Sequence, residues 1–469
     1  MSAPHSFGHS FWTTSRPTYC LASTGRCTLY APLPVLHRPD TVDEEDAVPA
    51  QQIALIHARL IDGTGAPPID DATVVVEGKE ILAAGATVRI PADAKIIDVA
   101  DATVMPGLID GHVHLRAYAG HGAADVHLWN VTTFIEEQTL HAAGNARRAL
   151  QTGVTTVRDM AGGRPEVSVK HAIDDGVLSG ARVIASGFVG MTAGHGDMFC
   201  PAAVDHRLWP PADGVDACRK LVRQYARDGL DLIKICTSGG VLSVGDKNEW
   251  RNYTFEETLA IVDEAHALGM RVAAHAHTRA GIRRAVEAGV DTLEHGSSLD
   301  AELIELMLER GTWLCPTLAI VEYIMQRGRA RGVPEESLAK AEAMRASRLA
   351  SVRAAYEAGV PIFMGTDSCN TFPFGDHAWE LELLLTQLGM SPMEAIVSAT
   401  QSAAAALDIA ELTGTVAPGK RADLLVINGD PLADLALLRD ENAILAVFQN
   451  GEVKVDRGLP APVMVAASV

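Results

Sequence analysis

Two pairs of histidines in this sequence have a spacing that suits metal binding. His112 and His114 form the triplet His-Val-His, and His275 and His277 form a second triplet within Ala-His-Ala-His. Because side chains two residues apart on a strand face the same side, both imidazoles of a pair can point at one metal ion. Surface strands also carry such pairs, so a single pair is a weak signal.

Three further polar residues stand within or at the ends of apolar runs. Lys234 lies between isoleucines in Leu-Ile-Lys-Ile-Cys, His295 ends Leu-Glu-His-Gly, and Asp367 ends Gly-Thr-Asp. A buried lysine is costly unless it is paired or chemically altered. Each residue also has an ordinary explanation, as an edge lysine, a core histidine or a helix-capping aspartate. Five predicted strands each carry a histidine, a lysine or an aspartate at or near their end. Chance does not explain this coincidence, and the residues together predict a metal site.

The elements that must position these residues are short apolar runs that alternate with helical patterns. This alternation predicts an α/β fold, a (β/α)8 TIM barrel, with its active site at the carboxyl ends of the strands. An open doubly wound sheet is the runner-up, although the first run is not followed by a G-x-G-x-x-G turn. The eight predicted strands are 107–114, 154–160, 181–187, 230–236, 271–277, 291–296, 312–318 and 361–367.

The flanks of this region are rich in β-type patterns and predict a small second domain. We expect residues 52–105 and 408–469 to form one β-sandwich, beside a catalytic barrel of residues 106–407. Asn450-Gly451 between two apolar runs predicts a β-hairpin. Residues 1–51 have no lasting periodicity and are expected to be a disordered or atypical leader.

Composition narrows the class of protein without deciding it. The 469 residues carry a formal net charge of −20, and only 5% are aromatic. Nucleic-acid binding and polybasic membrane binding are therefore not expected, and no apolar run is long enough for a membrane span. The seven cysteines include no C-x-x-C pair, which favours a reducing compartment and a cytoplasmic location.

Taken together, the motifs resemble those of the amidohydrolase superfamily over about residues 52–460. Within that superfamily, the motifs are most similar to those of the branch that contains prolidase-like carboxypeptidases (Xaa-Pro and Xaa-Arg/Lys dipeptidases) and ochratoxin-hydrolysing enzymes. It implies a metal-dependent amide hydrolase that often forms homo-oligomers. The motifs are PGLIDGHVHL at 106–115, TAGHGD at 192–197, DLIKICTSGG at 231–240, AHAH at 274–277, LEHG at 293–296, GTDS at 365–368 and the tail GTVAPGKRADLLVINGDPL at 414–432.

The resemblance also implies which residues hold two divalent ions, most often zinc, although cobalt, manganese and iron suit the same ligands. The more buried ion would be bound by His112, His114 and Asp367. The more exposed ion would be bound by His275 and His295, and a carboxylated Lys234 would bridge the two. Such a pair activates a bridging hydroxide and polarises the scissile carbonyl, and Asp367 can relay the proton to the leaving amine.

Substrate contacts are expected from four residues in or beside these motifs. His277 and His195 could hydrogen-bond the carbonyl oxygen or a substrate carboxylate. Arg251 and Tyr253 could hold the carboxylate through a guanidinium fork and a hydroxyl. The alternative is that Arg251 is a solvated loop charge and Tyr253 a packing residue.

Three functions compete at this point. The first is release of a C-terminal amino acid from a dipeptide, an N-acyl amino acid or an ochratoxin-like amide, which makes the partner a small molecule. The second is hydrolysis of a cyclic amide, urea or carbamate, such as an imidazolone or a herbicide-like compound. The third is a non-catalytic scaffold, which predicts at least one missing ligand, and none of the six is missing.

Overall fold

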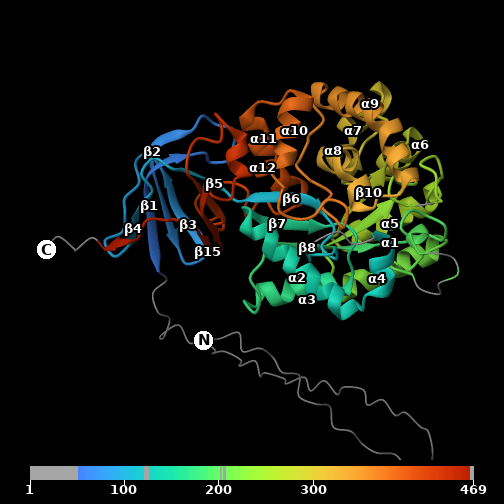
Figure 1. The fold of residues 1–469 in the computed structure, drawn as a ribbon, viewed down its shortest axis with the longest axis horizontal. Coiled ribbons are helices and arrows are strands. Elements are labelled where there is room, and N and C mark those ends of the chain that lie inside the picture. The colour runs from blue at the N-terminus through green and yellow to red at the C-terminus, as the bar shows by residue number, and fades with distance from the viewer. Residues whose placement is uncertain (1–50, 121–125, 201–202, 204–206, 244, 465–469) are drawn as a thin grey trace, which may run out of the picture. The chain divides into compact units, whose positions relative to one another are not determined.

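The computed structural model describes residues 51–464, except for residues 121–125, 201–202, 204–206 and 244 (Figure 1). The predicted leader therefore lies outside the described residues, apart from Gln51. The described residues all fall in one compact unit that contains two sheets.

Both flanks of the chain contribute strands to one nine-stranded sheet, seen on the left in Figure 1. The path of the sheet is β15-β14-β13-β5-β1-β2-β3, while β4 pairs with β1 and β16 pairs with β4. The predicted hairpin is confirmed, because Asn450 and Gly451 both have positive φ and join β14 to β15. The strands are β1 (Gln52–Leu60), β2 (Ile69–Glu77), β3 (Glu80–Gly85), β4 (Lys95–Asp98), β5 (Thr103–Pro106), β13 (Leu424–Ile427), β14 (Ile444–Gln449), β15 (Glu452–Asp456) and β16 (Val463–Met464).

This sheet has an apolar cluster of its own but is also tied to the second sheet. The buried Asp423 carboxylate accepts a hydrogen bond from Arg182 of β8 at 2.7 Å, and its other oxygen accepts one from the backbone of Asn450 at 2.8 Å. A separate β-sandwich at 52–105 and 408–469, and a barrel confined to 106–407, thus remain predictions.

The second sheet is a nearly closed barrel of seven parallel strands, in the order β12-β11-β10-β9-β8-β7-β6. Its strands are buried along almost their whole length, as expected for parallel strands covered by helices. They are β6 (Leu108–Val113), β7 (Val154–Asp159), β8 (Arg182–Phe188), β9 (Leu232–Cys236), β10 (Arg271–Ala276), β11 (Thr292–His295) and β12 (Trp313–Cys315).

The eighth predicted strand, 361–367, is where the structure differs from the sequence-based expectation. The segment lies between the two ends of the sheet, with a single bridge from Ile362 to β12 and another from Ser368 to β6. Pro361 has no N–H to give a ladder, and Asp367 has a φ of 60°, outside the extended region. The segment closes the gap without becoming a regular strand, so the eight-strand count is not confirmed.

Helices follow most barrel strands and cover the outside of the barrel (Figure 1). Glycines in the left-handed conformation end several of them, as at Gly289 after α6. No helix in the described part of the chain is long and apolar enough to cross a bilayer. The helices are α1 (Val126–Thr132), α2 (Ile135–Gln151), α3 (Arg164–Asp174), α4 (Val215–Asp228), α5 (Phe255–Ala267), α6 (Arg279–Ala288), α7 (Ala301–Arg310), α8 (Leu318–Arg327), α9 (Glu335–Glu357), α10 (Trp379–Leu383), α11 (Pro392–Ser398) and α12 (Gln401–Ala406).

Candidate active site

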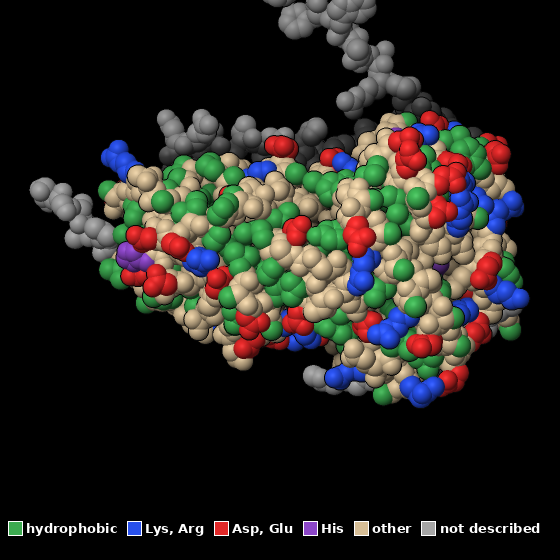
Figure 2. Space-filling view, turned by 90° about the horizontal axis from the view of Figure 1, so that it is seen from above, with side chains coloured by type: hydrophobic (Ala, Val, Ile, Leu, Met, Phe, Trp, Pro, Cys, Tyr) green, Lys and Arg blue, Asp and Glu red, His purple; other side chains and the backbone are tan. Residues whose placement is uncertain are grey.

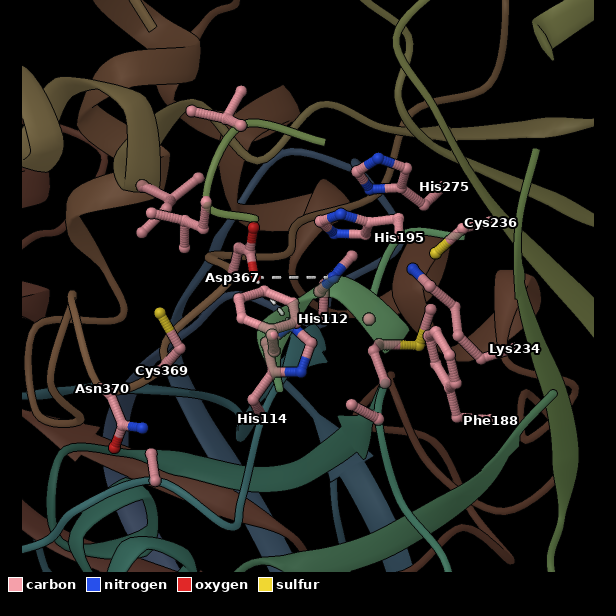
Figure 3. A pocket seen from close by; sticks show the side chains of 18 of the residues that line it. His112, His114, Phe188, His195, Lys234, Cys236, His275, Asp367, Cys369 and Asn370 are labelled. Carbon is pink, nitrogen blue, oxygen red and sulfur yellow. Dashed lines mark ion pairs between the residues drawn. The ribbon is translucent and has the colours of Figure 1, made fainter. Parts of the chain in front are cut away.

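A cavity at the carboxyl ends of the barrel strands brings together all six predicted metal ligands. It is also lined by His195, which Figure 3 labels, and by His277. The six ligands come from five segments that are far apart in the sequence, and the barrel geometry alone makes them neighbours. The six are His112, His114, Lys234, His275, His295 and Asp367.

One group of ligands forms around Asp367. Its Oδ1 atom lies 2.9 Å from His114 Nε2 and 3.7 Å from His112 Nε2. The ligand atoms of these three residues all lie within 4.8 Å of one another, which suits one ion. Burial alone would raise the pKa of Asp367, but the imidazoles and the Lys234 ammonium lower it to about 2, so the carboxylate is ionised.

A second group contains the buried imidazoles of His275, His277 and His295. Their ring centroids are 4.5 to 4.9 Å apart. Burial lowers the pKa of all three, to about 3 for His277. The imidazoles are therefore neutral and have a lone pair for a metal ion or an N–H for a substrate.

Two of these residues have strained backbones. His295 has a φ of 72° and Asp367 a φ of 60°, in a region that costs non-glycine residues about 1–3 kcal/mol. Both stand where a strand or strand-like segment turns out of the barrel. Such outliers cluster at functional sites, and here they aim the two side chains into the cavity.

Lys234 lines the same cavity as both groups, and its charge lowers the pKa of Asp367 in one group and of His275 and His295 in the other. Its side chain is buried on β9, and among the described residues its Nζ atom has no ion pair or hydrogen-bond partner. A buried ammonium without a direct partner is costly unless it is paired or chemically altered.

Partners behind the cavity orient His112. Its Nδ1 lies 2.7 Å from the buried Glu294 carboxylate, which also accepts a hydrogen bond from Arg158 at 2.8 Å. Although burial raises the pKa of Glu294, Arg158 and His112 hold it well below its usual range. The Nδ1 therefore donates to an ionised carboxylate, and the Nε2 lone pair faces the cavity, the arrangement common for a metal-bound histidine.

His195 is fixed in a comparable way. Its ring stacks on His275, with centroids 4.6 Å apart and 16° between the planes. Its Nδ1 lies 2.6 Å from Ser243 Oγ, and that hydroxyl donates to Asp246 at 2.7 Å. A Cβ atom at Gly240 would lie 2.1 Å from the ring, so only glycine leaves room for it.

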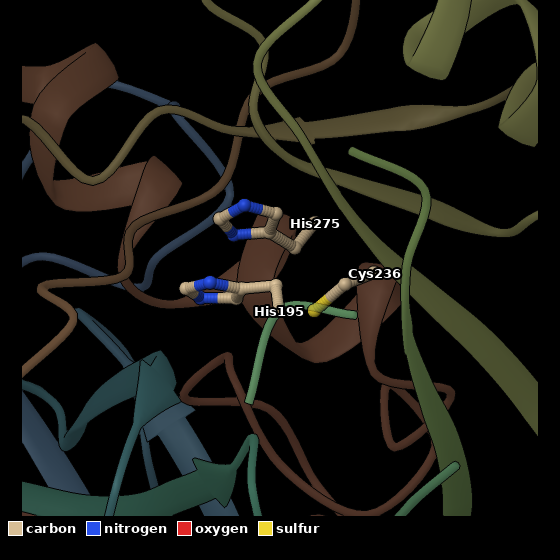
Figure 4. Close-up of side chains that lie close together, drawn as sticks. All are labelled: His195, Cys236 and His275. Atoms are coloured by element: carbon tan, nitrogen blue, oxygen red, sulfur yellow. The ribbon is translucent and has the colours of Figure 1, made fainter. Parts of the chain in front are cut away.

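Cys236 faces the same side of β9 as Lys234 and lies beside His195 and His275 (Figure 4). The sulfur and the nearest nitrogens of the two imidazoles lie within 4.8 Å of one another. Burial raises the pKa of the Cys236 thiol to about 12.

The structure does not bring Tyr253 and Arg251 into the cavity. Tyr253 is buried, and its hydroxyl donates to the backbone carbonyl of Val189 at 2.6 Å. Arg251 is exposed and forms an isolated bridge with Ser238. The placement of both residues follows the packing and loop alternatives, and it gives no support to a carboxylate-binding role.

The sequence-based prediction missed several polar residues of the cavity wall. Asp159 ends β7, and burial together with Glu166 raises its pKa to about 7. Its position at the end of a predicted strand was a usable signal. Arg348 has no such signal, because it lies inside α9, where only the fold shows that it is buried and reaches the carbonyl of Thr317 at 2.7 Å. The missed residues include Arg116, Asn130, Gln138, Asp159, Arg348 and Asn370.

Comparisons with known proteins agree with this geometry. The amidohydrolase family model matches residues 103–454. Ochratoxinase from Aspergillus niger is 33% identical over 429 residues, which cover 86% of this chain and 86% of that protein. The crystal structure of A. niger ochratoxinase has a TM-score of 0.78 at 32% identity and covers 88% of this chain and 97% of that one.

A second solved structure is equally similar. It is a Xaa-Pro dipeptidase with methionine bound in its active site, with a TM-score of 0.78 at 33% identity, covering 86% of this chain and 99% of that one. The chain thus belongs to the amidohydrolase family, in the branch of ochratoxinase and the Xaa-Pro dipeptidases, and is a hydrolase of amide bonds.

Proposed function

We propose that this protein is a binuclear metal-dependent hydrolase that releases a C-terminal amino acid from a dipeptide or an N-acyl amino acid, ochratoxin-like amides included. The names of its relatives support this substrate class, since one is an ochratoxinase and another a Xaa-Pro dipeptidase that holds methionine.

The unpartnered Lys234 is the observation that carries the binuclear part of the proposal. It lines the same cavity as the group of His112, His114 and Asp367 and the group that contains His275 and His295, and its charge acts on members of both. A carboxylated lysine is an anion with two oxygen ligands, which suits a position between two cations. Imidazole, carboxylate and carbamate ligands fit zinc best among the ions that they accept.

In this assignment each group of ligands holds one ion. His112, His114 and Asp367 would hold the more buried ion, His275 and His295 the more exposed one, and carboxylated Lys234 both. When bound, two such ions lower the pKa of a water molecule and polarise the scissile carbonyl.

The chain's own residues then handle protons and substrate. Asp367 is ionised and strained toward the cavity, so it can take a proton from the attacking water and pass it to the leaving amine. His277 and His195 stand on the cavity wall with one ring nitrogen each held by a serine hydroxyl, at 2.8 and 2.6 Å. The other nitrogen of His277 is placed to bind the carbonyl oxygen or the carboxylate of the substrate. For His195, the chain of Ser243 and Asp246 puts the proton on Nδ1, so its Nε2 atom can accept a hydrogen bond from a substrate N–H.

A substrate screen tests the chemistry. Purified protein would be offered dipeptides and N-acyl amino acids that differ in the C-terminal residue, together with cyclic amides, ureas and carbamates. Turnover of the first group is expected. Turnover of only the second group would replace the proposal by the cyclic-amide alternative.

Lys234→Ala tests the binuclear centre. We expect metal analysis to show about two ions per chain in the wild type, and removal of these ions by a chelator to abolish activity. In the variant, the metal content should fall below about one ion per chain and the activity at least about 100-fold. Lys170→Ala, which removes a half-buried ammonium paired with Asp231, is the control. A Lys234→Ala protein with two ions and full activity would reject the carbamate.

A further inference from the structure

Cys236 carries a thiol, a group that commonly binds metal ions, and it lines the cavity. The proposed function gives this thiol no role. The residue follows Lys234 by two residues on β9, so its side chain also points into the barrel. The close-up shows its side chain beside those of His195 and His275 (Figure 4). A buried thiol beside two imidazoles offers one sulfur and two nitrogen donors, a set that favours thiophilic ions.

The hydrogen bonds around His195 determine which of its nitrogens can bind a metal. Ser243 uses its hydroxyl hydrogen on Asp246, whose carboxylate also accepts hydrogen bonds from Lys340 at 3.1 Å and from the Gly240 backbone at 3.1 Å. The Ser243 oxygen must then accept from His195 Nδ1. The Nε2 atom of His195 is left with a lone pair, as in a metal-binding histidine with an outer partner.

In His275 the other ring nitrogen, Nε2, is the one that donates a hydrogen bond. Its Nε2 lies 3.2 Å from the Gly239 carbonyl, which can only accept. Nδ1 therefore has the lone pair. One nitrogen of each ring and the Cys236 sulfur lie within 4.8 Å of one another. The rings of His195 and His275 are stacked with 16° between their planes, so one ring must turn before both lone pairs can point at one ion.

We propose that His195, Cys236 and His275 form a site for a thiophilic divalent ion. The inference rests on the proposed function only in that the site shares His275 with the more exposed ion of the pair. Sulfur and nitrogen ligands of a tetrahedral ion lie about 3.6 Å apart, given bonds of about 2.3 and 2.1 Å. The present upper limit of 4.8 Å closes to that value when the Cys236 side chain rotates and His195 turns out of its stack, a turn that gives up its hydrogen bond to Ser243 for a bond to the metal. Binding forms a metal–sulfur bond and releases the thiol proton to solvent.

Because the proposed site and the more exposed catalytic ion share His275, the two cannot be occupied independently. His275 has one free lone pair, so an ion held by Cys236 takes His275 away from His295. A soft ion such as Cd²⁺ would then compete with the catalytic pair, whereas Mn²⁺, which prefers oxygen ligands, would not. The site makes the enzyme selective among metals.

The test is a titration of the metal-free full-length protein with Cd²⁺, followed by ultraviolet thiolate-to-metal charge-transfer absorption. The wild type should show this band, and Cys236→Ser should lose it. Cys369→Ser is the matched control, because Cys369 lines the same cavity outside the cluster, and it should keep the band. His195→Gln retains the thiol and should weaken Cd²⁺ binding about 10–100-fold.

Two outcomes would overturn the site. One is the absence of a band in the wild type. The other is a band that survives Cys236→Ser, including one that disappears instead in Cys315→Ser, since Cys315 lies near His112 and Glu294. The readout is independent of turnover. A Cys236-dependent band without amide hydrolysis would reject the proposed function alone, and hydrolysis without the band would reject this site alone.

Discussion

At the scale of single residues, the partner of each imidazole determines its charge and its direction. His112 donates to Glu294, and His275 donates to a backbone carbonyl. These contacts leave one lone pair of each ring facing the cavity, and burial keeps both rings neutral. The site is thus prepared for cations before any cation binds.

A neutral buried histidine makes stability depend on pH. Burial lowers the pKa of His277 to about 3, from 6.5 in the unfolded chain. Between these values the unfolded state binds a proton that the folded state does not, so the contribution to stability is present above pH 6.5 and is lost as the pH falls.

We predict that metal-free His277→Gln loses less stability than the wild type as the pH falls from 6.5 toward 3. The difference in slope should reach up to about 1.4 kcal/mol per pH unit, measured by urea unfolding at a series of pH values. His171→Gln, on the exposed surface of α3, should keep the wild-type slope. Identical slopes in all three proteins would contradict the pKa assignment.

At the scale of elements, each strand end delivers one or two side chains, and the helix that follows holds the strand in place. The helix α5 packs on β10, which carries His275. It begins at a capping box, in which Thr254 Oγ1 accepts from the Glu257 backbone at 3.2 Å and Glu257 accepts from the Thr254 backbone at 2.7 Å.

Removal of this cap should destabilise the fold without changing the chemistry. We expect Thr254→Ala to lower the free energy of unfolding by about 1 kcal/mol, with the metal content unchanged. Ser168→Ala, which removes an exposed hydroxyl from the interior of α3, should cost less than about 0.5 kcal/mol. Chemical denaturation of both variants compares the two values, and equal losses would show that the cap contributes nothing specific.

At the scale of the whole molecule, the two sheets depend on each other. Asp423 links the beginning of β8 to the hairpin of β14 and β15 through Arg182 and Asn450. On the surface, acidic and basic side chains are interspersed over the face shown in Figure 2. Homo-oligomer formation stays a prediction, as does a small-molecule partner.

Asp423→Ala should therefore affect both sheets together. The change leaves the Arg182 guanidinium without its buried partner, and breaking such a pair costs about 3–5 kcal/mol. Glu452→Ala removes an exposed partner of Lys454 in the same sheet and should cost less than about 1 kcal/mol. Thermal unfolding followed by circular dichroism measures the loss of stability in both variants. If Asp423→Ala loses no more stability than Glu452→Ala, Asp423 is not a structural link.

The sequence alone determined the family, the parallel barrel and the six predicted metal ligands that line the cavity. Those conclusions depend on local rules: alternation on a strand places His112 and His114 on one side, and the carboxyl ends of parallel strands meet at one edge. Glycine and asparagine set the hairpin at Asn450 because their backbones accept positive φ.

Only the tertiary structure decided the rest. Glu294 and Arg158 meet although 136 residues separate them, and Lys340 reaches Asp246 across 94 residues. Tyr253 turned out to be a buried packing residue, and 361–367 a bridging segment without a ladder. Periodicity describes neighbours along the chain, whereas hydrogen-bond partners, ladder pairing and burial depend on which distant segments the closed barrel brings together.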